Sequence, residues 1–384
     1  MRGRGRSDGR TVVFCGTRGV PAGYGGFETA VDEISRRFVE NGYDCVVVCR
    51  RSSGGDAPKT HKGRRLVYVE GSSSAKLDTF VSAFETGWHL LRHRDAYGHV
   101  FWFNNANFPG ILLTLLARLP MSVNTDGMEW RRAKWAWPFK AYYFLASFLV
   151  ARLCRSLISD SKAMRSFYKK VFRKDTECIP YGVPDIPSVP DERRSDILKR
   201  YGLEAGRYFL QITRFEPDNL PLKAARTFRD AGLARQGFKF LLVGYQRPTP
   251  YAQEIKAMAG KENVLVADAV YDPEVVATLR QSCFSYVHGN SVGGTNPALI
   301  EAMATCPRVL AIDVPFSREM LGETGFFFRP DDMASAFRDV LGRADRSAVM
   351  RRRVRSLYRW DDVAQSYMRL VEGRPAGYPP FSKD

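Results

Sequence analysis

Residues 291–304 read SVGGTNPALIEAMA, a pair of glycines that runs directly into an apolar helix. Asn296 is a favourable N-cap residue, and the proline after it suits the first helical position. Amides at such a helix start bind phosphate or sugar hydroxyls, because Gly293 and Gly294 leave the backbone uncovered. Glu301 lies a turn further in, where its carboxylate could accept hydrogen bonds from the two hydroxyls of a ribose. A bare helix cap with a solvated glutamate explains the segment about as well, so other segments must decide.

A second glycine loop follows the first expected strand. Residues 16–29 read GTRGVPAGYGGFET, after an apolar strand at 11–15 and before an amphipathic helix. The helical spacing predicts a buried face and a polar face. The buried face is Phe27, Ala30, Val31, Ile34 and Phe38, and the polar face is Glu28, Asp32, Glu33, Arg36 and Arg37. Gly23, Gly25 and Gly26 do not spell the GxGxxG of a dinucleotide site. Arg50 ends the next strand where an NAD enzyme carries an acid, so only an NADP enzyme stays open.

The remaining pattern predicts two domains of parallel sheet covered by helices. The chain has 384 residues, 45% of them hydrophobic, which is enough for two cores. Strand-like runs alternate with helical patterns, as in parallel α/β folds. These runs are 44–49, 66–69, 100–103, 121–124, 208–212, 240–244, 284–287 and 309–312. The proline-rich stretch 181–192, YGVPDIPSVPDE, marks a linker. We therefore expect one domain at 11–184 and another at 193–360.

Cysteine and histidine usage argues against a metal site. The chain has seven cysteines, an odd number, and no CxxC pair, which predicts reduced thiols in the cytoplasm. The five histidines do not cluster with cysteines at ligand spacing, and no Asp-x-Asp stands beside a strand end. We expect neither a metal nor a bound cofactor.

The formal charge of +17 implies an anionic partner. Residues 1–10 form a basic, glycine-rich arm with the composition of a disordered segment. A second basic cluster lies at 343–359. A third cluster mixes basic with aromatic residues: Trp130, Arg131, Arg132, Lys134, Trp135, Trp137 and Lys140. No nucleic-acid-binding motif accompanies the charge, so we expect an anionic membrane surface and no nucleic acid. The apolar run 141–151 is too short to span a bilayer and fits a core helix or a membrane-facing helix equally well.

Seven ordered segments carry a resemblance to a known family. They are GTRGVPAGYGGFETAV (16–31), HKGRRLVYV (61–69), VNTDGMEWRRAKW (123–135), SDSKA (159–163), IPYGVP (179–184), TRFEPDN (213–219) and VHGNSVGGTNPALIEAMA (287–304). Together they resemble the retaining glycosyltransferases of family four, in the bacterial branch typified by rhamnosyltransferases of capsule and cell-wall polysaccharide. The resemblance implies the α/β GT-B fold, two Rossmann-like domains facing across a cleft. It further implies that the second domain holds the nucleotide sugar, that the first holds the acceptor, and that a C-terminal helix within 361–384 packs back on the first domain.

The resemblance also assigns donor-binding residues. Glu301 matches the glutamate that binds the ribose hydroxyls, and Arg214 matches the arginine that holds the diphosphate and stabilises its departure. Gly25 and Gly26 match the glycine loop that approaches the diphosphate from the other domain.

Two positions depart from the family pattern. Gly293 stands where a first glutamate is expected, and Asn219 stands where a lysine is expected. The amides of Gly294 and Thr295, with Asn296, would then contact the sugar in place of the glutamate. Both departures are typical of the branch that uses dTDP-β-L-rhamnose, whose 6-deoxy sugar offers one hydroxyl fewer.

Catalytic and acceptor candidates are fewer. Asp126 follows a strand and opens a polar loop, so it could contact the acceptor hydroxyl or the reacting sugar, or be a turn residue before Gly127. His288 could contact the donor or simply bond to backbone. Glu129 and Arg131 could shape the acceptor site or only cap and solvate the next helix.

The sequence thus predicts a cytoplasmic glycosyltransferase, peripheral on the inner face of the plasma membrane. It would move L-rhamnose from dTDP-β-L-rhamnose to a hydroxyl of a glycan or polyprenyl-diphosphate-linked acceptor. The alternatives are a transferase of the same fold with a UDP- or GDP-sugar donor, an NADP-dependent oxidoreductase and a nucleic-acid-binding protein.

Overall fold

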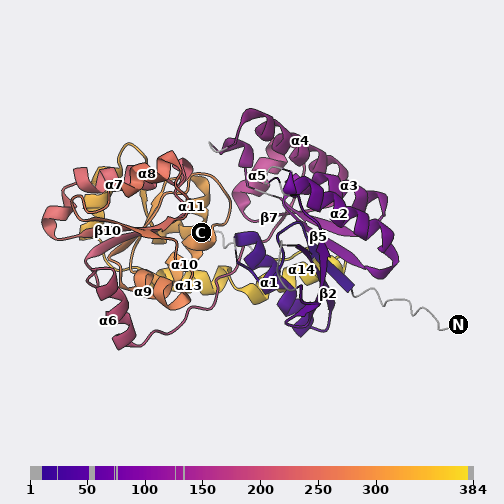
Figure 1. Cartoon of the computed structure of the whole chain (residues 1–384), viewed down its shortest axis with the longest axis horizontal. Helices are drawn as coiled ribbons and strands as arrows, with labels where there is room; N and C mark the ends of the chain where they lie inside the picture. The colour runs from indigo at the N-terminus through magenta and orange to yellow at the C-terminus, as the bar shows by residue number, and fades with distance from the viewer. Residues whose placement is uncertain are drawn as a thin grey trace. The chain divides into compact units, whose positions relative to one another are not determined.

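The chain folds into two compact α/β units in the computed structural model (Figure 1). The structure describes residues 11–378 except 24, 52–56, 73, 75–76, 126 and 133–134, so the basic arm at 1–10 lies outside the described residues. The first unit comprises Met1–Arg131, Trp135–Gly182 and Arg359–Asp384. The second comprises Val183–Tyr358 together with Arg132–Lys134.

The first unit is built on an eight-stranded sheet of order β3-β4-β2-β1-β5-β6-β7-β8. Neighbouring strands are parallel, except that β3 is antiparallel to β4. The strands are β1 (Thr11–Cys15), β2 (Asp44–Arg50), β3 (Thr60–His61), β4 (Arg64–Val69), β5 (His99–Phe103), β6 (Met121–Asn124), β7 (Ser156–Ser159) and β8 (Glu177–Cys178). The central strands β1 and β5 are buried along their whole length, as strands covered on both faces must be.

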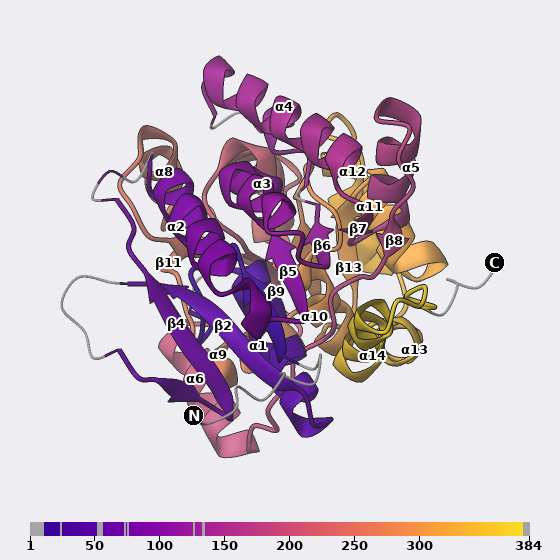
Figure 2. The same cartoon turned by 90° about the vertical axis from the view of Figure 1, so that its right-hand side faces the viewer.

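Helices cover both faces of this sheet. Phe101 and Phe103 of β5 pack with α1 (Gly26–Glu40) and α14 (Trp360–Val371). Trp102, between them, points to the opposite face, where its indole N–H donates to Thr114 of α3 (Phe108–Leu116) over 3.0 Å. Figure 2 shows α2 (Asp78–Arg92), α3 and α4 (Trp137–Leu153) side by side. The remaining helix of the unit is α5 (Lys162–Val171).

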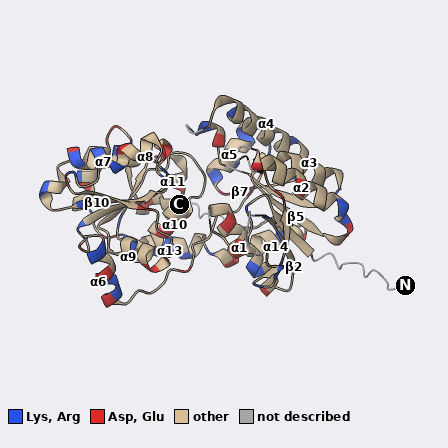
Figure 3. Cartoon of the chain, in the orientation of Figure 1, with Lys and Arg blue, Asp and Glu red and all other residues tan. Residues whose placement is uncertain are grey.

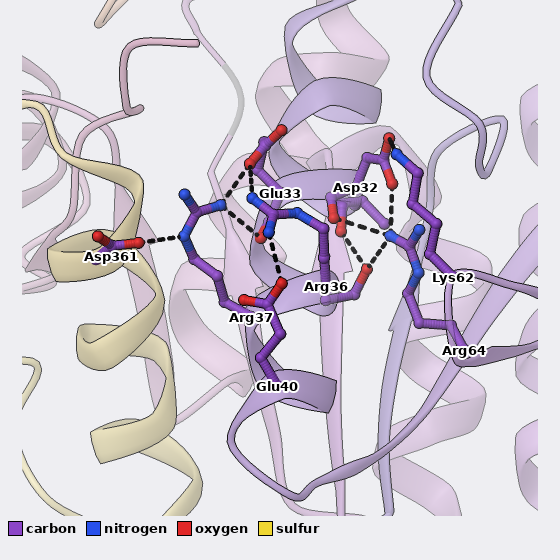
Figure 4. A network of polar contacts seen from close by, with 10 residues as sticks. Asp32, Glu33, Arg36, Arg37, Glu40, Lys62, Arg64 and Asp361 are labelled. Carbon is purple, nitrogen blue, oxygen red and sulfur yellow. Dashed lines mark hydrogen bonds and ion pairs between the residues drawn. The ribbon is translucent and has the colours of Figure 1, made fainter. Parts of the chain in front are cut away.

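The chain returns to the first unit through α14, which polar contacts fix to α1. Arg37 of α1 donates to Asp361 of α14 over 2.6 Å and also pairs with Glu33 (Figure 4). Beside it, the fully buried Arg64 of β4 donates to Asp32 over 2.5 Å and to the Ser35 hydroxyl over 3.0 Å. Because Arg64 has no access to water, these bonds satisfy a charge that would otherwise be costly to bury.

The second unit is built on a six-stranded parallel sheet of order β11-β10-β9-β12-β13-β14. Phe209, Phe228, Phe240 and Phe337 interlock edge to face in its core. The strands are β9 (Tyr208–Ile212), β10 (Lys239–Tyr245), β11 (Val264–Asp268), β12 (Ser285–His288), β13 (Val309–Ile312) and β14 (Phe326–Phe328). The helices are α6 (Asp191–Arg200), α7 (Pro221–Asp230), α8 (Pro250–Lys256), α9 (Pro273–Ser282), α10 (Pro297–Thr305), α11 (Pro315–Leu321), α12 (Met333–Asp339) and α13 (Ser347–Leu357).

The predicted fold class, two domains of parallel sheet and helices, is confirmed. Each strand expected from the apolar runs is present within a residue or two, while β3, β7, β8, β11 and β14 were not expected. One assignment within α1 is wrong. Glu28, placed on the polar face by its spacing, is buried, and its carboxylate accepts the Arg18 N–H over 3.2 Å.

We predict that Gly182→Ala undocks α14. A Cβ at Gly182 would lie 2.5 Å from the Trp360 indole and 2.8 Å from its backbone nitrogen, so the helix start must move. Overpacking of this kind costs about 1–3 kcal/mol. Urea denaturation of the full chain measures it. The control is Gly342→Ala, because a Cβ there meets nothing within 4 Å. Equal unfolding free energies for the two variants would contradict the assigned role of Gly182.

Candidate functional site

The second unit has one point where its strand order reverses direction. Strands β10 and β11 extend from one side of β9, while β12, β13 and β14 extend from the other. In open parallel sheets, ligands bind outside the carboxyl ends of the strands at such a switch point. The segment after β9 carries Arg214, and the segment after β12 is the glycine loop at 289–296. Both predicted donor-binding segments therefore meet at this position of the sheet.

The two segments are bonded to each other. Both the N–H and the hydroxyl of Ser291 donate to the Asp218 carbonyl, over 3.0 Å and 2.9 Å. Gly289 has to be glycine, because a Cβ would lie 2.4 Å from the Asn219 carbonyl oxygen. The buried Asn219 side chain donates to the Arg214 carbonyl over 2.9 Å. Asn219 thus shapes the segment that carries Arg214, and its predicted contact with the donor stays a prediction.

The glycine loop ends in a capped helix start. Asn296 caps α10, accepting the Ala298 N–H over 3.0 Å, with a proline in the first turn, which confirms the predicted cap. Gly293 has φ of +151°, a conformation that strains any residue with a Cβ, although nothing lies within 4 Å of the Cβ position. Gly294 and Thr295 are buried in the loop. The backbone here is shaped for glycine, so a glutamate at position 293 would be strained.

Glu301 is held by an arginine that the sequence analysis did not single out. Arg280 of α9 is 5% exposed, and its guanidinium donates to the Glu301 carboxylate. Burial alone would lower the pKa of Arg280, but the charge of Glu301 outweighs it and holds this pKa above its usual value. The sequence offered one indication of a buried ion pair here: Arg280 is the one charged residue in the stretch VVATLRQS at 275–282. The carboxylate keeps partial exposure, 23% of its side chain, so it can still accept a ligand's hydroxyls.

Two cations on the segment that follows β9 have only weak ion-pair partners. Arg214 is half exposed, with its guanidinium 4.0 Å from the Glu216 carboxylate. Lys223 at the start of α7 is 3.8 Å from Asp331. Exposed pairs at these distances contribute little, so both side chains are available to an anionic ligand.

His288 ends β12 and is buried, 3% exposed. Burial lowers its pKa to about 3, so the ring is neutral at physiological pH and cannot act there as a cationic ligand for a diphosphate. A neutral ring can still donate or accept one hydrogen bond. Its donor contact stays a prediction.

The sheet of the first unit reverses direction between β1 and β5. Gly16, just after β1, has φ of +90°, and a Cβ there would lie 2.4 Å from the Phe103 carbonyl oxygen. Asn107, after β5, donates to the Gly16 carbonyl over 3.0 Å. The gap between these loops, lined by Gly16, Arg50, Thr86 and Asn107, is too small to admit a water molecule. In both units, therefore, two loops approach each other closely at the switch point.

Gly25 and Gly26 stand at the start of α1. Gly25 is its N-cap in an extended conformation, with no side-chain cap, and its carbonyl accepts the Thr29 N–H over 3.1 Å. These amides face the end of the helix that favours anions. Their predicted approach to a diphosphate stays a prediction.

The acceptor-side candidates are only partly placed. Asp126 lies outside the described residues. Glu129 and Arg131 lie in a short 3₁₀ helix, Glu129–Arg131. The Glu129 carboxylate accepts the Trp135 indole N–H over 3.0 Å, whereas the Arg131 side chain is exposed.

Two of the three tryptophans in the basic aromatic segment pack against aromatic neighbours and one is exposed, so membrane docking through this segment stays a prediction. Trp130 packs against Phe144 and Phe167, and Trp135 packs against Phe139 and Tyr143. These contacts shield Trp130 and Trp135 from solvent. Of the three tryptophans, only Trp137 is strongly exposed, at 77%. Lys134 lies outside the described residues.

Among the described residues, no three His, Cys, Asp or Glu side chains gather in a way that could hold a metal ion.

Sequence families match two segments of the chain. Residues 112–184 match a domain of unknown function, DUF1972, and residues 210–344 match glycosyl transferases group 1. The second match contains Arg214, Arg280, the glycine loop and Glu301. No curated protein matches the chain in sequence.

Solved structures confirm the GT-B fold. Sucrose-phosphate synthase from Thermosynechococcus elongatus has a TM-score of 0.77 at 15% identity, covering 95% of this chain and 98% of its own. A glycosyltransferase from Rickettsia africae has a TM-score of 0.71 at 14% identity, covering 95% and 98%. Anabaena HepE (Alr3699), solved with UDP and glucose, has a TM-score of 0.69 at 13% identity, covering 94% and 99%. At these identities the likeness is one of fold.

We predict that Arg280 and Glu301 are energetically coupled. Arg280→Met should be strongly destabilising because it leaves the carboxylate without its cation, whereas adding Glu301→Gln should recover part of the loss. A double-mutant cycle by urea denaturation should give a coupling of about 1–3 kcal/mol. The cycle with the exposed pair Arg226 and Glu254 is the control, expected below about 0.5 kcal/mol. Additive effects of Arg280→Met and Glu301→Gln would contradict the pairing.

Proposed function

We propose that the chain is a retaining glycosyltransferase that uses a nucleoside-diphosphate sugar as donor. The observation that carries this proposal is the Glu301 carboxylate, fixed by the buried Arg280 one turn inside a helix that begins at a glycine loop on the switch point. A diphosphate needs cations and the positive end of a helix, and a ribose needs a rigid hydrogen-bond acceptor, so this combination suits both. The glycosyltransferase group 1 match over the same residues supports it.

In this proposal each group has a separate task. Glu301 accepts hydrogen bonds from the two ribose hydroxyls. Arg214, aided by Lys223 and the positive N-terminal end of the α10 dipole, faces the diphosphate. As the sugar leaves, negative charge grows on the diphosphate and positive charge grows on the sugar ring, so cations and amides already in position lower the barrier. Retention of the anomeric configuration follows from the family resemblance.

For the donor sugar we propose L-rhamnose, supplied as dTDP-β-L-rhamnose. The loop supports a deoxysugar because the backbone at Gly293 disfavours the side chain that would hold a further hydroxyl, leaving the Gly294 and Thr295 amides. A UDP-sugar is the second candidate, since HepE, a protein of the same fold, has been solved with UDP-glucose.

For the acceptor we propose a hydroxyl of a lipid-linked glycan, within the synthesis of a bacterial surface polysaccharide. The first unit has its own switch point, where Asn107 bonds the loop after β5 to the loop after β1, and open parallel sheets bind ligands at such a position. Asp126 remains the proposed residue for contact with the acceptor hydroxyl or the reacting sugar.

We predict that dTDP-rhamnose gives turnover and that Arg214→Ala lowers kcat/KM by about 30- to 1000-fold, or about 2–4 kcal/mol. The assay follows nucleotide release with dTDP-rhamnose, UDP-glucose, UDP-N-acetylglucosamine and GDP-mannose in separate reactions. Arg226→Ala, which removes an exposed arginine from the same unit, is the control and should leave turnover unchanged. Turnover with UDP-glucose alone would replace the rhamnose proposal. Unchanged turnover of Arg214→Ala would remove Arg214 from the site.

We also predict activity without a metal ion. Arg214, Lys223 and the helix amides supply the positive charge that a divalent cation supplies in other transferases. Turnover should persist in excess EDTA. Loss of turnover that magnesium or manganese restores would show that the diphosphate is held through a metal.

A further inference from the structure

Three helices of the first unit expose large apolar side chains to solvent. On α2 and at its N-cap the exposed fractions are 55% for Leu77, 37% for Val81, 49% for Phe84 and 39% for Trp88. On α3 they are 40% for Leu112 and 63% for Leu116. On α4 they are 77% for Trp137, 43% for Phe144, 54% for Leu145, 36% for Phe148 and 47% for Leu153. We call this set the apolar face. Clustering of this kind marks an interaction site, whereas single exposed apolar residues are ordinary.

The exposed residues follow the same spacing on two helices. Leu77, Val81, Phe84, Trp88 and Arg92 line one side of α2 at steps of four, three, four and four residues. Trp137, Ala141, Phe144, Phe148 and Arg152 repeat these steps along α4. Each stripe is therefore straight, and each ends in an arginine one turn beyond its last aromatic ring.

The terminal arginines lie over those rings. The Arg92 guanidinium is 4.9 Å from the centre of the Trp88 ring, and that of Arg152 is 5.2 Å from the centre of the Phe148 ring. An arginine that covers an apolar surface with its stem while keeping its charge in solvent is the arrangement found where an apolar layer meets anionic head groups.

The three helices form one continuous surface. Gly87 of α2 meets Gly110 of α3, where a Cβ on either residue would clash with the other helix. Phe80 of α2 packs on Tyr142 of α4 with ring centres 4.7 Å apart. Figure 2 shows the helices side by side on the same face of the sheet. Since each connects parallel strands, all three run against the strand direction and end at the same edge.

That edge is cationic. Arg92, Arg118, Arg152 and Arg155 are exposed there, and none forms an ion pair within the described part of the chain. Exposed arginines elsewhere do form ion pairs, for instance Arg65 with Asp44. No Asp or Glu occurs in α3, α4 or α5, and in Figure 3 the ribbons of α3 and α4 are largely free of red.

We propose that the apolar face, with this arginine edge, docks on the surface of an anionic lipid bilayer. Apolar and aromatic side chains would enter the layer between head groups and acyl chains, and the arginines would meet lipid phosphates. A protein partner would need an apolar surface ringed by acids, whereas a bilayer supplies both properties along the full length of the helices. The described part of the chain contains no candidate membrane-spanning helix. The contact that we propose is with the surface of the bilayer.

This surface shares Trp137 and α4 with the segments that the sequence analysis connected with a membrane. It adds α2 and α3, which the sequence analysis did not connect with lipid, and it does not use Trp130 or Trp135. The inference goes beyond glycosyl transfer and does not depend on it, although it would explain how the protein reaches a lipid-linked acceptor.

The test is flotation of the full chain with vesicles of phosphatidylcholine, with and without phosphatidylglycerol, at physiological ionic strength. The apolar variant is Phe84→Gln/Trp88→Gln/Phe148→Gln, and the cation variant is Arg92→Gln/Arg152→Gln. The control is Arg352→Gln/Arg355→Gln on α13, which removes the same charge from two exposed arginines of the second unit. All seven positions are at least one-third exposed, so a matching thermal midpoint checks that each variant is folded.

The wild type should float with phosphatidylglycerol vesicles and not with neutral ones. The apolar and cation variants should each lose about tenfold or more in partition coefficient, and the control less than about twofold. A wild type that does not float, or face variants that float like the wild type, would overturn the proposal. Self-association of the wild type that the apolar variant abolishes, without any flotation, would assign the face to a second copy of the chain. Nucleotide release with a water-soluble acceptor, measured on the same variants, keeps this outcome separate from the transferase assay.

Discussion

The buried ion pair between Arg280 and Glu301 sets the geometry of the second unit. Arg280 has almost no access to water, and its Nε has no hydrogen-bond partner among the described residues. A guanidinium in this position is tolerable only while the Glu301 carboxylate offsets its lost hydration. The pair therefore fixes α9 against α10 and keeps the carboxylate in one orientation. The same requirement that stabilises the helix pair gives the site a preorganised hydrogen-bond acceptor.

A second constraint is the closeness of loops at the switch points. In the second unit, Gly289 lies so close to the Asn219 carbonyl that no side chain fits, and in the first unit Gly16 lies as close to the Phe103 carbonyl. Hydrogen bonds join the loops in both units, from Ser291 to the Asp218 carbonyl in the second and from Asn107 to the Gly16 carbonyl in the first. Two sheets without detectable sequence repetition thus arrive at the same solution, because parallel sheets leave a crevice only where their connections diverge.

The fold was predictable from the sequence where strands are buried on both faces. Apolar runs such as Thr11–Cys15 have no other reasonable explanation, whereas β8 and β14 have two and three residues and carry too little pattern. The N-cap Asn296 was predictable because capping is a local property.

Arg280 was not assigned, since its partner is 21 residues away and only the packing of α9 on α10 brings them together. The helical pattern wrongly placed Glu28 on the exposed face, because its hydrogen-bond partner, the Arg18 N–H, lies in a loop outside the helix. The parts of the apolar face on α2 and α3 were not predicted, and the α4 part stayed undecided, since an exposed apolar stripe and a core stripe have the same spacing.

Hydrogen–deuterium exchange of the full chain with and without a nucleoside diphosphate tests the central claim most directly, since it reads the amides of the site without requiring the sugar or the acceptor. With dTDP or UDP at saturation, we expect slower exchange in peptides that cover 289–300 and 213–220, and a matching loss of this protection in Glu301→Gln. The core strands β9 and β10 should be unchanged, as they are protected already. Slower exchange confined to the first unit, or none at the α10 loop while the nucleotide is bound, would contradict the assignment of the donor site to the switch point of the second unit.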